Sequence, residues 1–91
     1  MNLATIATMA GAEDLRATFA LEAAIRDGKN IKAAYEAAIA ARLAYIEAAH
    51  AETEENLKQK YPSYTPSELD TSQDYHLKNL RSEYSKLGMV K

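Results

Sequence analysis

The longest uninterrupted helical pattern in the chain runs from Ile31 to Lys60, with no glycine, no proline and few β-branched residues. At about 100° per residue, one set of its positions falls within about 40° of a single line along the helix. This set, the bulky line, consists of Tyr35, Ile39, Leu43, Ile46, His50, Thr53 and Leu57. Beside it lies an alanine face, made of Ala34, Ala38, Ala41, Ala48 and Ala49. A helix with two such faces is expected to be covered by other helices.

A second helix is predicted from Glu13 to Asp27. Its Leu15 and Phe19 share one face, whereas Leu21 and Ile25 share another. A helix that is apolar on two sides is expected to contact two neighbours.

Residues 1–11 allow two interpretations, a flexible arm or the first turns of this helix. If the helix starts at Gly11, the acids Glu13 and Asp14 fall in its first turn, where the helix dipole favours them. If it starts at Leu3, its length becomes about 38 Å, a better match to the roughly 45 Å of the long helix. Both interpretations remain open at this point.

The segment from Asp27 to Asn30 separates the two helices. Gly28 is predicted to take the left-handed position that ends the first helix, and the Asn30 side chain to cap the second. So short a connection forces an antiparallel hairpin. The small residues expected to face the alanine face are Ala17, Ala20 and Ala24.

Residues 61–71 are predicted to be a linker, because Pro62 and Pro66 end the long helix and stiffen the chain. The sequence from Thr65 to Glu68 has the form of a capping box with proline at its first helical position. A short helical turn is therefore expected at residues 66–69.

A last helix is predicted from Ser72 to Leu87, with Gly88 as its stop. Its apolar stripe is expected to lie along the bulky line and consists of Leu77, Leu80, Tyr84 and Leu87. The side expected to face away carries Asp74, Lys78, Arg81 and Ser85. The predicted fold class is all-α, in one helical domain of residues 1–91. In this three-helix arrangement, a long Ala-rich antiparallel helical hairpin carries a shorter C-terminal helix.

Composition indicates a thin core. Of the 91 residues, 18 are alanine, and there is one Phe and no Trp. A small domain with so few bulky side chains often completes its core by association. We therefore expect a homo-oligomer, with part of the bulky line or Leu21 and Ile25 left exposed in a single chain.

Charge and motifs narrow the function. A net charge of −2 argues against nucleic-acid partners and against anionic membrane surfaces. The longest uncharged run, residues 1–12, is too short to span a membrane and lacks a basic leader region. No cysteine, phosphate-binding loop or hydrolase motif occurs. We expect a soluble, cytoplasmic protein that is not an enzyme and binds no cofactor and no metal.

The candidate residues for partner binding fall into three sets. Four lie on the bulky line, Tyr35, Ile39, Leu43 and Ile46. Tyr61 and Tyr64 form an aromatic ledge that either grips a partner or packs back on the hairpin. Tyr75 and His76 stand beside the last helix's stripe, where a tyrosine off the packing face suits a partner contact.

His50 on the bulky line is interpreted as a packing residue that fixes register, with a pH switch as the alternative. The function predicted from these features is a non-catalytic interaction or assembly protein that binds itself or another protein through apolar helix faces. The alternative is a small inhibitor, of the kind viruses or mobile elements encode, that blocks a larger host protein. A nucleic-acid-binding helical module is a weaker third class.

Overall fold

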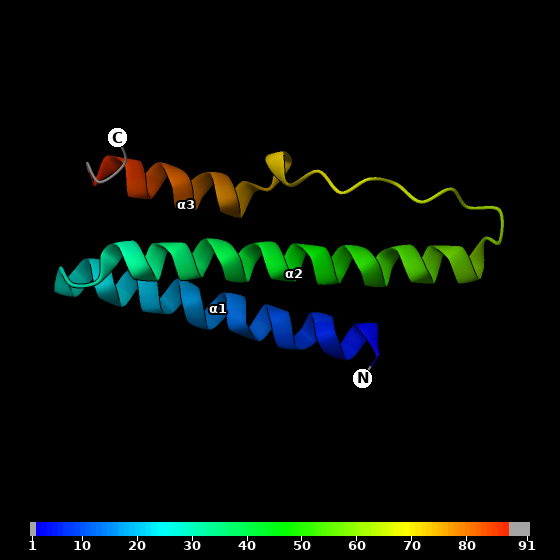
Figure 1. The fold of residues 1–91 in the computed structure, drawn as a ribbon, viewed down its shortest axis with the longest axis horizontal. Coiled ribbons are helices and arrows are strands. Elements are labelled where there is room, and N and C mark those ends of the chain that lie inside the picture. The colour runs from blue at the N-terminus through cyan, green and yellow to red at the C-terminus, as the bar shows by residue number, and fades with distance from the viewer. Residues whose placement is uncertain (1, 88–91) are drawn as a thin grey trace.

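The structure, a computed structural model, describes residues 2–87. It contains three α-helices, α1 (Leu3–Asp27), α2 (Ile31–Lys60) and α3 (Tyr75–Lys86), and one short 3-10 turn, η1 (Thr71–Gln73). The predicted all-α fold, a long hairpin with a shorter C-terminal helix, is confirmed. Figure 1 shows α2 between α1 and α3, so that the three helices form a single layer. The Cα atoms accordingly extend over 51 × 26 × 14 Å.

Helix α1 begins at Leu3, so the longer of the two alternatives is correct. The side chain of Asn2 caps it by accepting a hydrogen bond from the Thr5 N–H at 2.8 Å. Gly11 lies inside the helix, where a Cβ atom would stand 3.2 Å from the ring of Tyr45 on α2. Glycine at this position therefore lets an aromatic ring of α2 lie directly against the backbone of α1.

The turn between α1 and α2 was predicted correctly at Gly28 but not at Asn30. Gly28 has φ 69°, and its N–H donates to the carbonyl groups of Ala24 and Ile25. Asn30 also takes a left-handed backbone, with φ 56°, and its side chain makes no capping hydrogen bond. A capping side chain requires the extended backbone that Asn30 lacks, since only there does it reach back to the first N–H groups.

Small residues line the contact within the hairpin. Ala24 and Ala38 are buried, and Ala17 is half-buried. Ala20, which was expected at the same contact, is exposed. The contact surface that α1 presents to α2 is therefore narrower than the spacing of its alanines predicted.

All three helices meet around Ala38, which has no exposed surface. Its buried neighbours are Leu21 of α1 and Leu80 of α3. Nearby, the rings of Tyr35 and Tyr84 stack with their centroids 3.8 Å apart and their planes 8° apart. These contacts place α3 over the start of the bulky line, as the sequence predicted.

The rest of the α3 stripe follows its spacing except at the end. Leu77 is fully buried, whereas Leu87 is exposed because it follows the last residue of the helix. The helix begins at Tyr75 rather than Ser72, because Ser72 lies in η1. The predicted stop at Gly88 lies outside the described residues.

The helical turn predicted at residues 66–69 does not form. This part of the linker is not helical, and the backbone and side chain of Ser67 are bound to α2. Ser67 donates its hydroxyl to Glu54 at 2.7 Å, and its carbonyl accepts from His50 Nε2 at 3.1 Å. In a helix that started at Thr65, the Ser67 carbonyl would accept a backbone N–H four residues further on, and here it accepts from His50 instead.

Candidate functional site: a polar cluster between the helices

Arg42, in the middle of α2, is hydrogen-bonded to carboxylates on both sides. Its Nη1 donates to Oδ2 of Asp14 on α1 at 3.0 Å. Its Nε and Nη2 donate to the two carboxylate oxygens of Asp74, at 3.0 and 2.8 Å, in a bidentate pair. The hydrogen bonds that Arg42 donates to Asp74 and, with a smaller effect, to Asp14 raise the pKa of Arg42. One guanidinium thus joins α1, α2 and the start of α3.

Asp74 has a second role at the start of α3. Its Oδ2 accepts the backbone N–H of Leu77 at 2.9 Å and so caps the helix. The hydrogen bond from Arg42 holds the pKa of Asp74 below its ordinary value. The prediction that Asp74 faces away from α2 was wrong, because the residue precedes the helix and does not follow its periodicity. The same carboxylate therefore sets where α3 begins and where it docks.

Asp14 is the only charged residue that is buried among those the structure describes, at 8% exposed. It would lie in the first helical turn only if the helix started at Gly11; α1 begins at Leu3 and places it in the helix interior. Its Oδ2 binds Arg42, whereas its Oδ1 is buried and has no hydrogen-bond partner in the described chain. Nε2 of His76 lies 3.8 Å from Oδ1, beyond hydrogen-bond distance. A buried acceptor without a donor is uncommon and calls for an explanation.

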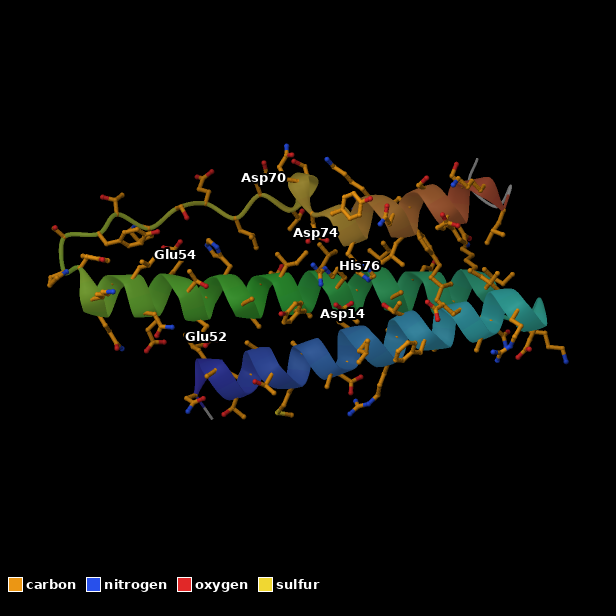
Figure 2. All side chains as sticks on the ribbon, turned by 180° about the vertical axis from the view of Figure 1, so that it is seen from behind. Asp14, Glu52, Glu54, Asp70, Asp74 and His76 are labelled. Carbon is orange, nitrogen blue, oxygen red and sulfur yellow. The ribbon has the colours of Figure 1, made fainter. Side chains whose placement is uncertain are left out.

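His76 of α3 contacts α1 through Thr18. The Thr18 hydroxyl donates to the carbonyl of Asp14 at 2.9 Å, so it has no second proton to give. Nε2 of His76, 3.2 Å from the same oxygen, must therefore be the donor. Figure 2 shows Asp14 and His76 on the sides of α1 and α3 that face each other. With His76 neutral, the cluster holds one more negative than positive group.

A second polar cluster fastens the linker to the far half of α2. Oε1 of Glu54 accepts the hydroxyl groups of Ser67 and Tyr64, at 2.7 and 3.1 Å. These two hydrogen bonds keep the pKa of Glu54 below its ordinary value, and the bond from Ser67 has the larger effect. His50 binds the linker carbonyl of Ser67, and both its role in fixing register and a pH-switching role stay predictions.

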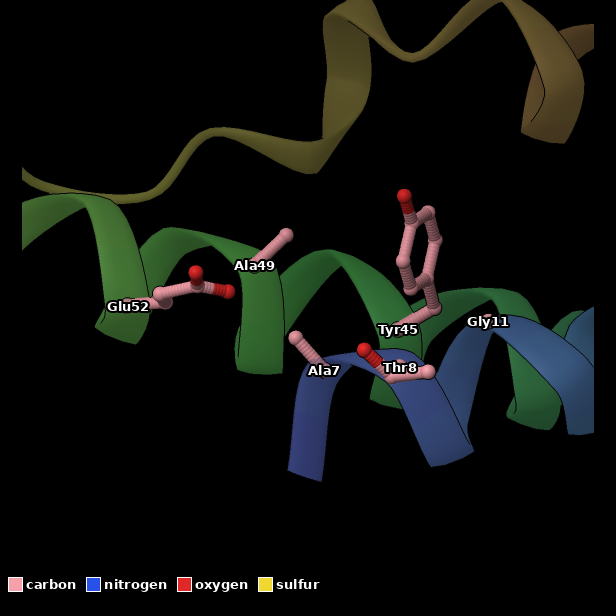
Figure 3. Close-up of a pocket in the computed structure, with 6 residues that line it drawn as sticks. All are labelled: Ala7, Thr8, Gly11, Tyr45, Ala49 and Glu52. Carbon is pink, nitrogen blue, oxygen red and sulfur yellow. The ribbon is translucent and has the colours of Figure 1, made fainter. Parts of the chain in front are cut away.

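A hollow of about 330 Å³ lies between the first half of α1 and α2. Figure 3 shows its lining, to which α1 contributes Ala7, Thr8 and Gly11 and α2 contributes Tyr45, Ala49 and Glu52. The lining offers the carboxylate of Glu52 and the hydroxyl groups of Thr8 and Tyr45, and the Thr8 hydroxyl donates to the Ala4 carbonyl at 2.9 Å.

Neither metal binding nor membrane insertion finds support in the described residues. Between residues 2 and 87, no three His, Asp or Glu side chains are grouped so as to hold a metal ion. In the same range, no helix is both long and apolar enough to cross a bilayer.

No protein-family model, curated protein or solved structure matches this chain. Its function must therefore be argued from the geometry of its own residues.

The four candidate partner residues on the bulky line lie mostly inside the chain. Tyr35 stacks on Tyr84, and Ile39 packs against the core. Leu43 and Ile46 are half-buried. Beyond the start of α3 the linker continues along the line, where the Ser67 carbonyl accepts from His50. Contact of these residues with a partner stays a prediction.

The remaining candidates differ in exposure. Tyr75 is 77% exposed and Tyr61 is also exposed, so both are accessible. Tyr64 is half-buried with its hydroxyl bound to Glu54, and His76 is half-buried beside Thr18. Their role in binding a partner likewise stays a prediction.

Sequence reasoning missed the central member of the cluster. Arg42 interrupts an alanine-rich, apolar stretch of α2, and a charged residue at such a position was the available signal. Its partner Asp74 was assigned to the side facing away, and Asp14 was considered only as an acid for a first helical turn. Asp14 and Asp74 lie 28 and 32 residues from Arg42 along the chain, beyond any local pattern.

Proposed function

We propose that the protein is a non-catalytic helical assembly protein that associates with a second copy of itself through an apolar surface of α1. The observation that carries this proposal is an exposed stripe on the side of α1 that faces away from α2. Met9, Leu15 and Phe19 of this stripe are 53%, 57% and 57% exposed. With the alanines between and after them, they form the outer stripe, defined as Met9, Ala12, Leu15, Phe19 and Ala23.

The geometry of an ideal helix supports the existence of this face. The five positions fall within about 120° of one another, on the side opposite the buried Ala7, Asp14 and Leu21. From Met9 to Ala23 the stripe is about 21 Å long. Contiguous exposed apolar surface of this kind usually marks a site of association.

The order of large and small residues favours a second copy as the partner. In an antiparallel pair of α1 helices about a two-fold axis near Leu15, Met9 of one copy lies opposite Ala23 of the other. Phe19 lies opposite Ala12 in the same arrangement. Large side chains then meet small ones on both sides of the axis, which is the self-complementarity that a two-fold interface requires.

The bulky line remains a second candidate surface for association, since Leu43 and Ile46 are half-buried rather than buried. A cytoplasmic location and a protein rather than a nucleic-acid partner also stay predictions, supported by the mixed charge of the chain.

Sedimentation equilibrium of wild type and two variants tests the assembly. We expect a mass above the 10.0 kDa of one chain at micromolar concentration, and the monomer mass for Phe19→Glu. Leu69→Glu is the matched control, because it places the same charge at an exposed apolar position of the linker, outside the outer stripe. Circular dichroism checks that all three proteins are helical. A wild-type protein of monomer mass at every concentration would contradict the proposal.

A further inference from the structure

A groove runs between α1 and α3 in the half of the molecule near the hairpin turn, and the hydrogen bond between His76 and Thr18 crosses it. It consists of two adjoining hollows of about 360 and 320 Å³, which share Thr18 and His76 as lining residues. The groove follows α1 from Gly11 to Ile25, about 21 Å or four helical turns. We call it the α1–α3 groove. It has the length of a short partner helix.

Apolar side chains line the part of the groove near the hairpin turn. Leu21 and Leu80 are buried there, and Ile25 is partly exposed beside them. An amphipathic helix that lays its apolar side into such a groove is a recurring mode of protein recognition.

The charges of the groove are mostly negative. Its acids are Asp14, Glu22 and Glu83, and its one permanent cation, Arg42, is already bound to two carboxylates. Glu83 makes an exposed ion pair with Lys86 at 3.5 Å, so it contributes less than Glu22. The groove as a whole is therefore complementary to a cationic side chain.

The buried oxygen of Asp14 marks where that cation would bind. Oδ1 has no hydrogen-bond donor in the described chain, although Asp14 lines the groove. The Thr18 hydroxyl is already committed to a backbone carbonyl, and His76 Nε2 is too distant for a hydrogen bond at 3.8 Å. The His76 side chain, 32% exposed, stands beside this oxygen on the α3 side of the groove.

We propose that the α1–α3 groove binds an amphipathic helix of a partner protein, which directs one lysine at Oδ1 of Asp14. The ammonium donates the missing hydrogen bond, while His76 turns outward and apolar residues of the partner cover Ile25. The inference rests on the proposed role in protein interaction, but it uses a different surface from the outer stripe, with only Leu15 bordering both.

The probe for this site is a 14-residue helical peptide with leucines three and four residues apart and one central lysine. Its match carries acetyl-lysine, which keeps the shape and removes the charge. Amide shifts in NMR titrations locate each peptide and give its dissociation constant. We expect shifts at Thr18, Leu21 and Ile25, and binding at least tenfold weaker for the acetyl-lysine peptide.

Two variants assign the effect to the groove. Asp14→Asn is expected to abolish the preference for lysine. If that variant does not fold, Glu22→Gln/Glu83→Gln, at exposed sites, is expected to weaken lysine-peptide binding at least threefold. Glu13→Gln/Glu36→Gln removes two exposed acids elsewhere and is expected to have no effect.

The inference would be overturned if the peptide caused no saturable amide shifts, or if the shifts lay on another face of the protein. It would also be overturned if both peptides bound equally well, or if the two double variants changed peptide binding equally. If the amide shifts of groove residues change when the protein is diluted without peptide, a second copy occupies the groove, which also overturns the inference. Sedimentation keeps the two proposals apart. If the protein is a monomer and binds the peptide, only the assembly proposal is refuted. If it is an oligomer and does not bind the peptide, only the groove proposal is refuted.

Discussion

Around Ala38, α2 is packed between two helices, whereas around Glu54 it is flanked by an extended chain. In the first region Ala38, Leu77, Leu80 and Tyr84 are buried, and the tyrosine rings stack. In the second region the linker is held by hydrogen bonds to the carboxylate of Glu54. The two regions belong to the same helix but are stabilised by different interactions.

This difference follows from the side chains that each part of α2 offers. After Ala51 the helix carries mostly charged residues, with Leu57 alone continuing the bulky line. Apolar burial favours a regular helix that can present a stripe, while a carboxylate can bind separate polar groups of an irregular chain. Stability is therefore expected to be concentrated near the hairpin turn, and the other end to open more readily.

The largest expected effect comes from removing the guanidinium that ties the first region together. Arg42→Met keeps an unbranched apolar stem but leaves Asp14 and Asp74 without their cation. Because removing one partner strands a largely buried charge, we expect a loss of about 3 kcal/mol in the free energy of unfolding, measured by urea denaturation. A loss of a few tenths would show that the cluster contributes little to docking α3.

The next prediction compares the same substitution in both regions. Ala38→Leu is expected to cost about 2 kcal/mol, because overpacking a filled contact forces the helices apart. Ala49→Leu, beside the hollow of about 330 Å³ in Figure 3, is expected to change the stability much less. Urea melts of the two variants measure the contrast, and equal losses would contradict it.

The smallest expected effect is on the response to acid. The folded-state pKa values of Asp74 and Glu54 lie below their ordinary values of 3.8 and 4.5. Each group therefore adds stability above its ordinary pKa, and this stability is lost as the pH falls through the lowered one. Asp74→Asn retains a capping side chain but removes this titration.

Urea melts between pH 6 and pH 2.5 test this prediction, a range chosen to span about one unit or more on each side of both ordinary carboxyl values. The free energy of unfolding falls as the pH is lowered, and we expect this fall to become smaller in Asp74→Asn than in Glu54→Gln. The reason is that Asp74 pairs with a cation, whereas Glu54 pairs with hydroxyl groups. A larger effect at Glu54 would reverse the order of the two regions.

The hairpin was predictable because its determinants are local. Gly28 ends α1 in the sequence position that left-handed caps occupy, and the spacing of Leu77, Leu80 and Tyr84 already defines the buried side of α3. Both features depend on residues at most seven positions apart.

The polar cluster and the course of the linker were not predictable in this way. Arg42 meets Asp14 and Asp74 only after three helices have packed, and Ser67 stays out of a helix because α2 binds its polar groups. Capping boxes and helix periodicity predict the secondary structure that a segment prefers in the absence of contacts with the rest of the chain. In these two places, contacts with a distant segment are stronger than the local preference.

The linker between α2 and η1 has one further consequence. All of residues 61–70 except Tyr64 are exposed, and none of them is helical. Exposed, irregular segments of this kind are where proteases cut a folded chain first. A single cut here leaves the hairpin as one peptide and α3 as another, joined only by side-chain contacts. The dissociation constant of the two fragments then reports, as a bimolecular affinity, how firmly α3 is docked.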